Sequence, residues 1–74
     1  MSLSARLKEL RVSRNLTQRQ VYNAVNMSTI GYRRYEYSER EPAFTNLIAL
    51  ANYFDISLDY LVGRSDGSRS VDLT

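Results

Sequence analysis

Two adjacent arginines, Arg33 and Arg34, are the side chains of this chain best suited to recognise a partner. A guanidinium carries its N–H donors in a planar fork and can bond both acceptors on the major-groove edge of a guanine. Each such pairing discriminates against the wrong base by roughly 1–3 kcal/mol. Either arginine can therefore be the base reader of a DNA-binding surface. The plainer alternative is a solvated helix face.

These arginines belong to a helix that the sequence predicts from Ser28 to about Ser38. Serine is a favoured N-cap, and the chain must become extended before Pro42 because the residue preceding a proline avoids helix. A helix turns by about 100° per residue, so its residues divide into two sides. The outer side holds Ile30, Arg33, Arg34 and Tyr37. The inner side holds Tyr32 and Tyr35, with Gly31 beside them.

Two residues in the first turn of this helix, Thr29 and Ile30, would point toward the floor of a DNA groove. Their methyl groups can contact the methyl group of thymine. An exposed isoleucine is equally consistent with contact to a partner protein, so Ile30 supports two interpretations. Gly31 costs the helix about 1 kcal/mol relative to alanine, and its missing side chain would allow close approach of DNA or of Tyr22.

A second group of residues is expected to contact phosphates. Gln18 lies in the first turn of the preceding helix, where free backbone N–H groups and the helix dipole favour an anion. The alternative for Gln18 is a plain helix former. Weaker candidates for contacts to the DNA backbone are Arg19, Tyr37, Arg40 and Asn46. The complete predicted DNA-binding set is Gln18, Arg19, Ser28, Thr29, Ile30, Arg33, Arg34, Tyr37 and Arg40.

One acidic residue, Glu36, lies next to this basic face and would repel phosphate unless it had a cationic partner. Arg11 is the candidate, because it follows Leu7 and Leu10 on the inward side of the first helix. We therefore expect a partly buried Arg11–Glu36 ion pair that links the first helix to the third. Two independent surface charges are the alternative.

The elements that must position these residues form a helix-turn-helix. The helix that carries Gln18 begins at Thr17, whose spacing from Gln20 is that of a capping box. About three residues around Asn26 separate it from the helix that begins at Ser28, and asparagine tolerates the positive φ of a tight turn. The buried side of the earlier helix is expected to be Val21, Ala24 and Val25.

Three further helices are predicted around this motif. The first runs to about Arg14 on an apolar stripe of Leu3, Leu7 and Leu10. The fourth is expected to be capped by Thr45 and to face mostly inward through Leu47, Ile48, Leu50, Ala51 and Phe54. Ser57 caps a short fifth helix that Gly63 ends.

Composition bounds the classes of function. The chain has 74 residues, no cysteine and no histidine, so it makes one domain without the usual metal ligands or nucleophile and base pairs. We expect no enzyme, metal or cofactor. Neither a membrane span nor a signal peptide is evident, which predicts a cytoplasmic protein. The domain is expected over residues 1–66, and the polar, glycine- and serine-rich residues 67–74 as a flexible tail or linker.

The chain resembles the phage-repressor and Cro type of helix-turn-helix, also called the xenobiotic-response-element (XRE) family. The resemblance spans residues 6–66 and rests on Arg6-Leu7-Lys8-Glu9-Leu10-Arg11, Leu16-Thr17-Gln18, Tyr35-Glu36, Arg40-Glu41-Pro42 and the run from Ile56 to Gly63. It implies an all-α, compact five-helix lambda-repressor-like domain. It also implies that Thr29, Ile30 and Arg34 read bases, that Gln18 and Tyr37 hold the DNA backbone, and that Arg11 and Glu36 form the family's ion pair.

Three residues depart from the family pattern. Asn26 replaces the usual turn glycine, Tyr32 replaces an aliphatic residue, and Tyr22 replaces a small residue where the second and third helices cross. Each tyrosine needs more volume than the residue it replaces. We therefore expect either that the two helices are displaced or that Tyr22 turns outward.

These observations predict a sequence-specific transcriptional repressor that binds an inverted repeat in double-stranded DNA as a homodimer. The dimer surface is expected around Tyr60 to Arg64. No small-molecule ligand and no membrane partner are expected. The alternative, of another class, is a protein-interaction module such as an antitoxin or a phage-regulator partner, which would use Ile30, Tyr22 and Tyr37 on the same fold.

Overall fold

The structure, a computed structural model, describes residues 2–63 of the chain. Five α-helices make up this part: α1 (Leu3–Ser13), α2 (Gln18–Ala24), α3 (Thr29–Glu36), α4 (Phe44–Phe54) and α5 (Leu58–Leu61). The all-α, five-helix prediction is confirmed. The tail expected at residues 67–74 lies outside the described residues.

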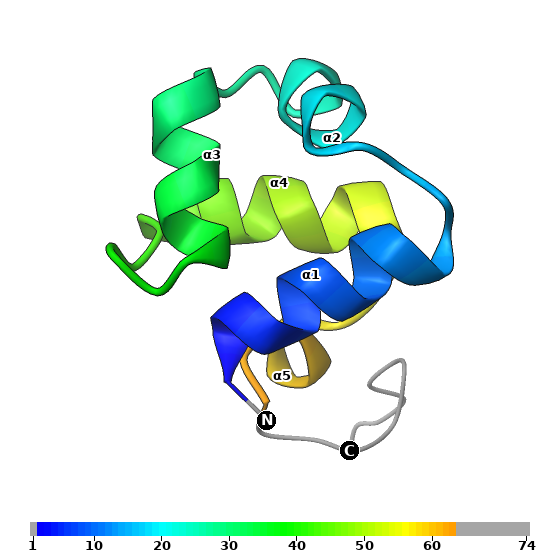
Figure 1. Cartoon of the computed structure of the whole chain (residues 1–74). Coiled ribbons are helices and arrows are strands. Elements are labelled where there is room, and N and C mark those ends of the chain that lie inside the picture. The colour runs from blue at the N-terminus through cyan, green and yellow to red at the C-terminus, as the bar shows by residue number, and fades with distance from the viewer. Residues whose placement is uncertain (1, 64–74) are drawn as a thin grey trace.

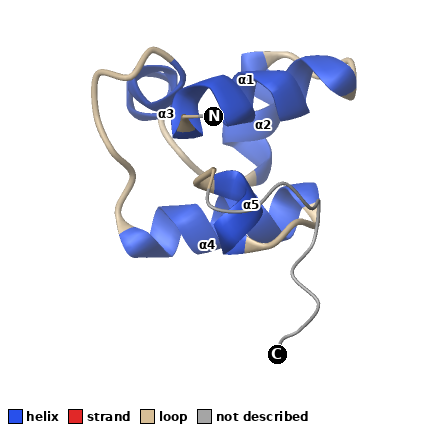
Figure 2. Cartoon of the chain, turned by 90° about the horizontal axis from the view of Figure 1, so that it is seen from below, coloured by secondary structure: helices blue, strands red, loops and turns tan. Residues whose placement is uncertain are grey.

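The helices pack so that α3 stands at the edge of the molecule. Figure 1 shows α2 end-on and α3 nearly across it, the steep arrangement of a helix-turn-helix. The first helix contacts α3 on one side and α5 on the other, and α5 also contacts α4. The view from below shows α5 lying over α4 (Figure 2), and Figure 1 shows α5 at the opposite end of the molecule from α2. Helices α2 and α3 therefore rest on a base of α1, α4 and α5.

The core lies between these layers. Its members come from all five helices and are almost wholly shielded from solvent: Leu7, Leu10, Val21, Tyr32, Tyr35, Leu50, Ala51, Phe54, Ile56 and Leu61. Two residues expected inside are not there. Ala24 is exposed and Ile48 is 37% exposed. Both lie at the edge of their helix's apolar stripe, where the helical repeat carries them past the neighbouring helix.

Side-chain caps fix where the helices begin. Ser2, Ser28 and Ser57 each accept a backbone N–H in the first turn of the following helix. The predicted capping box of α2 is present: Thr17 Oγ1 accepts from Gln20 N at 3.1 Å, and Gln20 Oε1 accepts from Thr17 N at 2.8 Å. The start of α2, with its free N–H groups, is thus closely defined.

Replacing Thr17 by alanine should lower the free energy of unfolding by about 1 kcal/mol, because it leaves an N–H of α2 without its acceptor. Chemical denaturation measures the change. Thr17→Ser keeps the hydroxyl and is the matched control. A Thr17→Ala variant as stable as the unaltered chain would show that the box contributes nothing.

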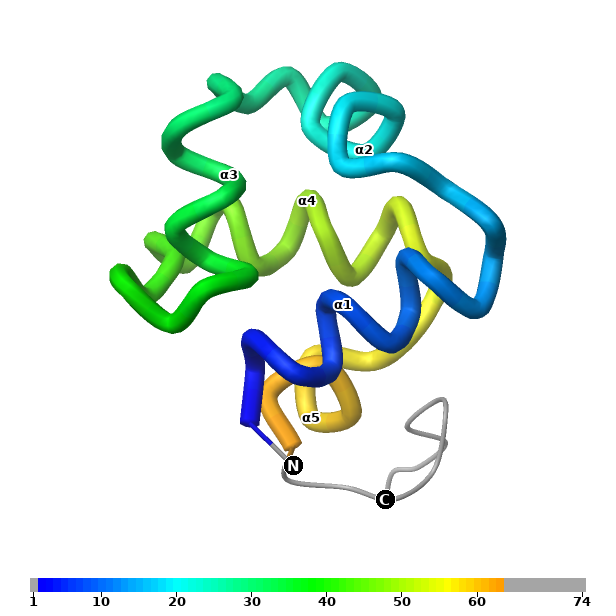
Figure 3. The backbone as a smooth tube through the Cα atoms, in the orientation of Figure 1, coloured from blue at the N-terminus to red at the C-terminus, as the bar shows by residue number. Residues whose placement is uncertain are grey.

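The connections between helices use residues in the left-handed region. Asn26, expected there, has a φ of 60°, and Asn15 and Asp55 have 57° and 58°. The chain path through these sharp reversals can be followed in Figure 3. The short turn between α2 and α3 is therefore accommodated without a glycine.

Two helix boundaries differ from the predictions. The third helix ends at Glu36 and not at Ser38, because Ser38 has a φ of 60° and the chain closes there through a bond from Glu39 N to Arg34 O of 2.8 Å. The predicted cap of α4 is also wrong. Ala43 is the N-cap, without a side-chain bond, and Thr45 lies inside the first turn, because the chain becomes helical directly after Pro42 and Ala43.

Candidate nucleic-acid interface

The outer side of α3 is free of the rest of the molecule. Ile30 is 65% exposed and Tyr37 is 52% exposed, and Arg33 and Arg34 are exposed as well. On the inner side, Tyr32 and Tyr35 are buried. The two sides predicted from the helical repeat are therefore confirmed. What remains exposed is a helix face with two guanidiniums, one aliphatic side chain and a phenol.

The inner side holds a carboxylate surrounded by donors. The side chain of Glu36 is 1% exposed. Arg11 donates to it twice, from Nε to Oε2 at 2.7 Å and from Nη2 to Oε1 at 3.1 Å. Gln18 Nε2 donates to Oε1 at 3.1 Å, and the Tyr32 hydroxyl donates to Oε2 at 2.5 Å. The expected Arg11–Glu36 pair is present, with two further neighbours.

These contacts set the ionisation of the cluster. Burial raises the pKa of Glu36, but hydrogen bonds from Arg11, Tyr32 and Gln18 outweigh it, so the pKa lies below its ordinary value. The hydrogen bond to Glu36 raises the pKa of Arg11. Burial, followed by the bond to Glu36, raises the pKa of Tyr32. At neutral pH the cluster is therefore a carboxylate, a guanidinium and a neutral phenol.

The Glu36 cluster, meaning Glu36 with Arg11, Gln18 and Tyr32, joins three helices. Arg11 comes from α1, Gln18 from the first turn of α2, and the other two from α3. Arg11 also donates from Nη1 to the carbonyl of Leu16 at 3.0 Å, which fixes the chain entering α2. The cluster thus sets α2 and α3 relative to one another directly behind the exposed face.

Removing the Tyr32 hydroxyl by Tyr32→Phe should lower the free energy of unfolding by about 1.5–3 kcal/mol, the usual range for a hydrogen bond to a charged group. The ring still fills the core, so little of this loss comes from packing. Thermal or chemical denaturation measures it, with Tyr53→Phe on the partly exposed face of α4 as the matched control. A loss no larger than that of the control would contradict a structural role for this bond.

A groove runs along one side of α3, between it and the helices α1 and α2. Its lining includes the cationic or polar side chains of Lys8, Gln18, Arg19, Thr29 and Arg33. The guanidinium of Arg33 lies 5.7 Å from the centre of the Tyr37 ring. Hydrogen bonding from Arg33, and then from Gln18, lowers the pKa of the Tyr37 phenol. Arg33 is thus drawn toward Tyr37 and toward this groove.

A second groove lies on the other side of α3, against the start of α4. Arg34 and Arg40 line it together with Gly31 and Asn46. Asn46 Nδ2 donates to the Tyr35 hydroxyl at 2.9 Å, which ties α4 to the base of α3. Among residues 2–63, the side chain of Arg34 has no hydrogen bond or ion pair. Of the two predicted base readers, Arg34 is thus the one left free.

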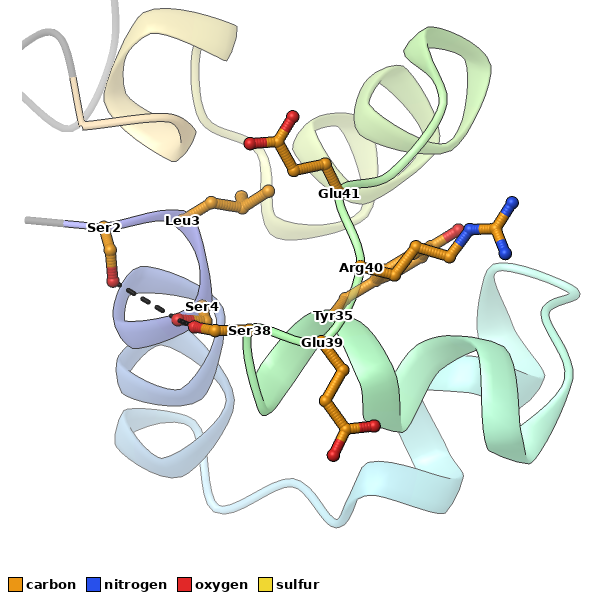
Figure 4. Close-up of a pocket in the computed structure, with 8 residues that line it drawn as sticks. All are labelled: Ser2, Leu3, Ser4, Tyr35, Ser38, Glu39, Arg40 and Glu41. Atoms are coloured by element: carbon orange, nitrogen blue, oxygen red, sulfur yellow. Dashed lines mark hydrogen bonds between the residues drawn. The ribbon is translucent and has the colours of Figure 1, made fainter.

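The charged residues after α3 point in different directions. Figure 4 shows that the Arg40 side chain extends along the direction of Tyr35, away from Ser4 and Ser38. Glu39 and Glu41 point to opposite sides of the chain in the same view. Ser4 and Ser38 are joined through their hydroxyls, which holds this connection to α1. The cation of Arg40 therefore faces the second groove, while Glu41 turns toward Leu3.

The structure also places the two unusual tyrosines. Tyr32 is fully buried, and Tyr22 is half-buried, with its ring tilted 49° against that of Tyr32 at 6.5 Å between centroids. Tyr22 thus reaches the wall of the first groove. Tyr32 therefore lies inside the core with its hydroxyl on Glu36, and Tyr22 is turned partly outward.

Sequence reasoning missed two features of this surface. Lys8 lines the first groove, although it was assigned no role. Tyr32 was expected only as a packing residue, whereas its hydroxyl completes the Glu36 cluster. The spacing of four residues between Tyr32 and Glu36 on one helix was a signal that could have found this bond.

Between residues 2 and 63, no three acidic, histidine or cysteine side chains come together as metal ligands. None of the helices within the same residues has the length and apolar character needed to span a membrane.

Comparison with known proteins gives consistent results. Residues 7–61 match the helix-turn-helix family model HTH_3. The chain is 35% identical over 69 residues to the HTH-type transcriptional regulator ImmR of Bacillus subtilis, covering 93% of this chain and 54% of that protein. It is 36% identical over 64 residues to the cryptic phage CTXphi transcriptional repressor RstR of Vibrio cholerae, covering 86% and 57%.

A solved structure is similar as well. A transcriptional regulator from Listeria innocua superposes with a TM-score of 0.79 at 30% identity, over 89% of this chain and 62% of that one. The chain spans about half the length of the curated relatives that it matches.

Proposed function

Because the chain belongs to the HTH_3, XRE-type family of helix-turn-helix proteins, we propose that it is a sequence-specific, double-stranded DNA-binding transcriptional repressor of phage or prophage type. It binds an inverted repeat as a homodimer. The observation that carries this proposal is the exposed, arginine-bearing face of α3, held from behind by the Glu36 cluster.

The two grooves beside α3 suit the two walls of a DNA major groove. An α-helix fits the major groove, whose walls are phosphate backbones. Lys8 and Arg19 supply cations on one side of α3, and Arg40 supplies one on the other. Phosphate contacts fix the register of a protein on DNA but carry no sequence information. Sequence would then be read between the grooves, by Thr29, Ile30 and Arg34.

Gln18 suits a double role in this arrangement. Its amide has two N–H groups, and one of them donates to Glu36. The second N–H, which faces the Tyr37 phenol in this structure, would turn to a phosphate at the start of α2, where the backbone N–H groups and the dipole also favour an anion. Gln18 would thus connect a bound phosphate to Glu36 on the buried side of α3.

The expected operator is an inverted repeat, which would be bound by a homodimer with two-fold symmetry. In dimers of helix-turn-helix proteins, the half-sites lie about one helical turn of DNA apart, roughly 34 Å. The dimer surface expected around Tyr60 to Arg64 gains no support from Tyr60, whose ring packs on the buried Arg6 at 3.8 Å. Arg64 lies outside the described residues. Sedimentation with and without a palindromic duplex tests the homodimer.

A mobility-shift experiment with mixed-sequence duplexes across a salt series tests the basic proposal. Neutralised phosphates release counterions, so affinity should fall linearly in a plot of log affinity against log salt concentration. A chain that leaves DNA unretarded at low salt would contradict the proposal.

The alternative function is a protein-interaction module on the same fold. The observation in its favour is the exposed apolar side chain of Ile30, with the exposed Tyr37 ring about two turns beyond it at the C-cap of α3. Ile30→Ala distinguishes the two functions. It should relax the preference for thymine at one position of a DNA site, whereas in a protein-interaction module it would weaken a partner complex and leave DNA retention unchanged.

A further inference from the structure

Gly31 occupies the third position of α3, where glycine is unfavourable by about 1 kcal/mol relative to alanine. The backbone conformation of Gly31 does not require glycine, because Gly31 does not have a positive φ. Among the described glycines only Gly63 has one. Core packing does not require it either. Within the described part of the chain, the one atom that an added Cβ would meet within 4 Å is Ser28 Oγ, at 2.8 Å.

A glycine at this position could make room either for the Tyr22 ring or for DNA. The surroundings of an added Cβ distinguish these two reasons. Tyr22 would be among the atoms near an added Cβ if the glycine made room for its ring, and it is not. The missing side chain therefore leaves space on the outside of the protein. A glycine on an exposed helix commonly serves where a ligand must come close to the backbone.

The space lies in the second groove, between α3 and the start of α4. Gly31 shares this groove with Arg34, Arg40 and Asn46. At about 100° per residue, Gly31 lies between exposed Arg34 and buried Tyr35, and so faces the side wall of the groove and not the outermost line of α3. The one carboxylate in its lining, Glu41, points away from Arg40 (Figure 4).

We propose that Gly31 is the point at which the sugar–phosphate backbone of one DNA strand comes against the recognition helix. The Arg40 guanidinium in the same groove meets the phosphate, and the bare helix backbone at Gly31 faces the adjoining deoxyribose. The inference rests on the proposed function. It adds a contact that sets how deeply α3 enters the major groove. Because the contact is to the backbone, it is independent of base sequence.

The test is the affinity of Gly31→Ala for DNA, measured on a selected duplex and on a mixed-sequence duplex. The added methyl group should hold the strand away and weaken binding to both by a similar factor, about tenfold, as expected for overpacking a close contact. The added Cβ also meets the Ser28 cap oxygen at 2.8 Å, so the melting temperature is expected to be unchanged or raised only where Ser28 is replaced by glycine.

The contact with Ser28 Oγ calls for a matched background. Ser28→Gly removes that oxygen and retains a residue that is acceptable as an N-cap. In this background, Gly31→Ala meets no protein atom, so the same fold-loss of affinity should persist. Equal affinity of Ser28→Gly and the double variant would overturn the inference.

Other outcomes are also decisive. A loss confined to the selected duplex would mean that Gly31 faces a base edge, and would overturn the assignment to the sugar–phosphate backbone. If the unaltered chain does not retard DNA at all, the proposed function fails together with the inference. If the unaltered chain binds DNA and Gly31→Ala binds equally well, the inference fails alone.

Discussion

Arg11→Met should lower the free energy of unfolding at neutral pH by about 3–5 kcal/mol, the cost of leaving one charge of a buried pair without its partner. Methionine keeps most of the aliphatic length of the arginine, so the loss comes mainly from the charge. The Glu36 carboxylate would stay in a site that is 1% exposed, with only Gln18 and Tyr32 as donors. Chemical denaturation at pH 7 measures this loss. Lys8→Met, an exposed lysine on the same helix, is the matched control.

The free energy of unfolding should change with pH in opposite directions in the unaltered chain and in the Arg11→Met variant. In the unaltered chain the folded-state pKa of Glu36 lies below its ordinary value, so its contribution is complete above that value and is lost as pH falls through the folded pKa. In Arg11→Met burial dominates and raises this pKa, so the variant should gain stability on acidification from neutral pH as Glu36 takes up a proton. A loss below 1 kcal/mol, with parallel pH profiles, would show that the pair is not structural.

Arg34→Ala should relax the sequence preference for DNA. A bidentate contact to guanine discriminates by roughly 1–3 kcal/mol, so one position of the site should lose its base preference by roughly 5- to 150-fold. Arg34 is the better candidate because Arg33 is drawn toward Tyr37, whereas Arg34 has no side-chain partner among residues 2–63. Binding-site selection with both proteins measures the change.

Arg19→Ala is the matched control for Arg34. Arg19 is exposed in the first turn of α2. At this position we expect its guanidinium to meet phosphate and not bases. Its removal should weaken all duplexes alike and make the salt dependence shallower by about one phosphate contact. If Arg34→Ala behaves like Arg19→Ala, with its sequence preference intact, base reading must be assigned elsewhere, first to Arg33.

Local chemistry made the framework of the fold predictable. Thr17 with Gln20, and Ser28 alone, define helix starts through bonds between residues three apart, which a sequence displays directly. The helical repeat likewise separated buried Tyr32 and Tyr35 from the exposed arginines. The expectation failed at Thr45, because the chain leaving Pro42 becomes helical before reaching it.

The finer geometry of the surface depends on contacts between distant segments. The convergence of Arg11, Gln18 and Tyr32 on a single carboxylate depends on how three helices pack. The position of Lys8 in the wall of the first groove has the same origin. The contact of Arg33 with Tyr37 is different in origin, because their spacing of four residues on one helix is a local signal.

Selection of binding sites from a random duplex pool, with the unaltered chain, tests most directly whether the exposed face of α3 reads DNA. We predict enrichment of an inverted repeat whose half-sites lie about one helical turn apart, bound with an affinity that falls steeply as salt increases. Recovery of an unenriched pool, with whatever retention occurs indifferent to salt, would contradict this account.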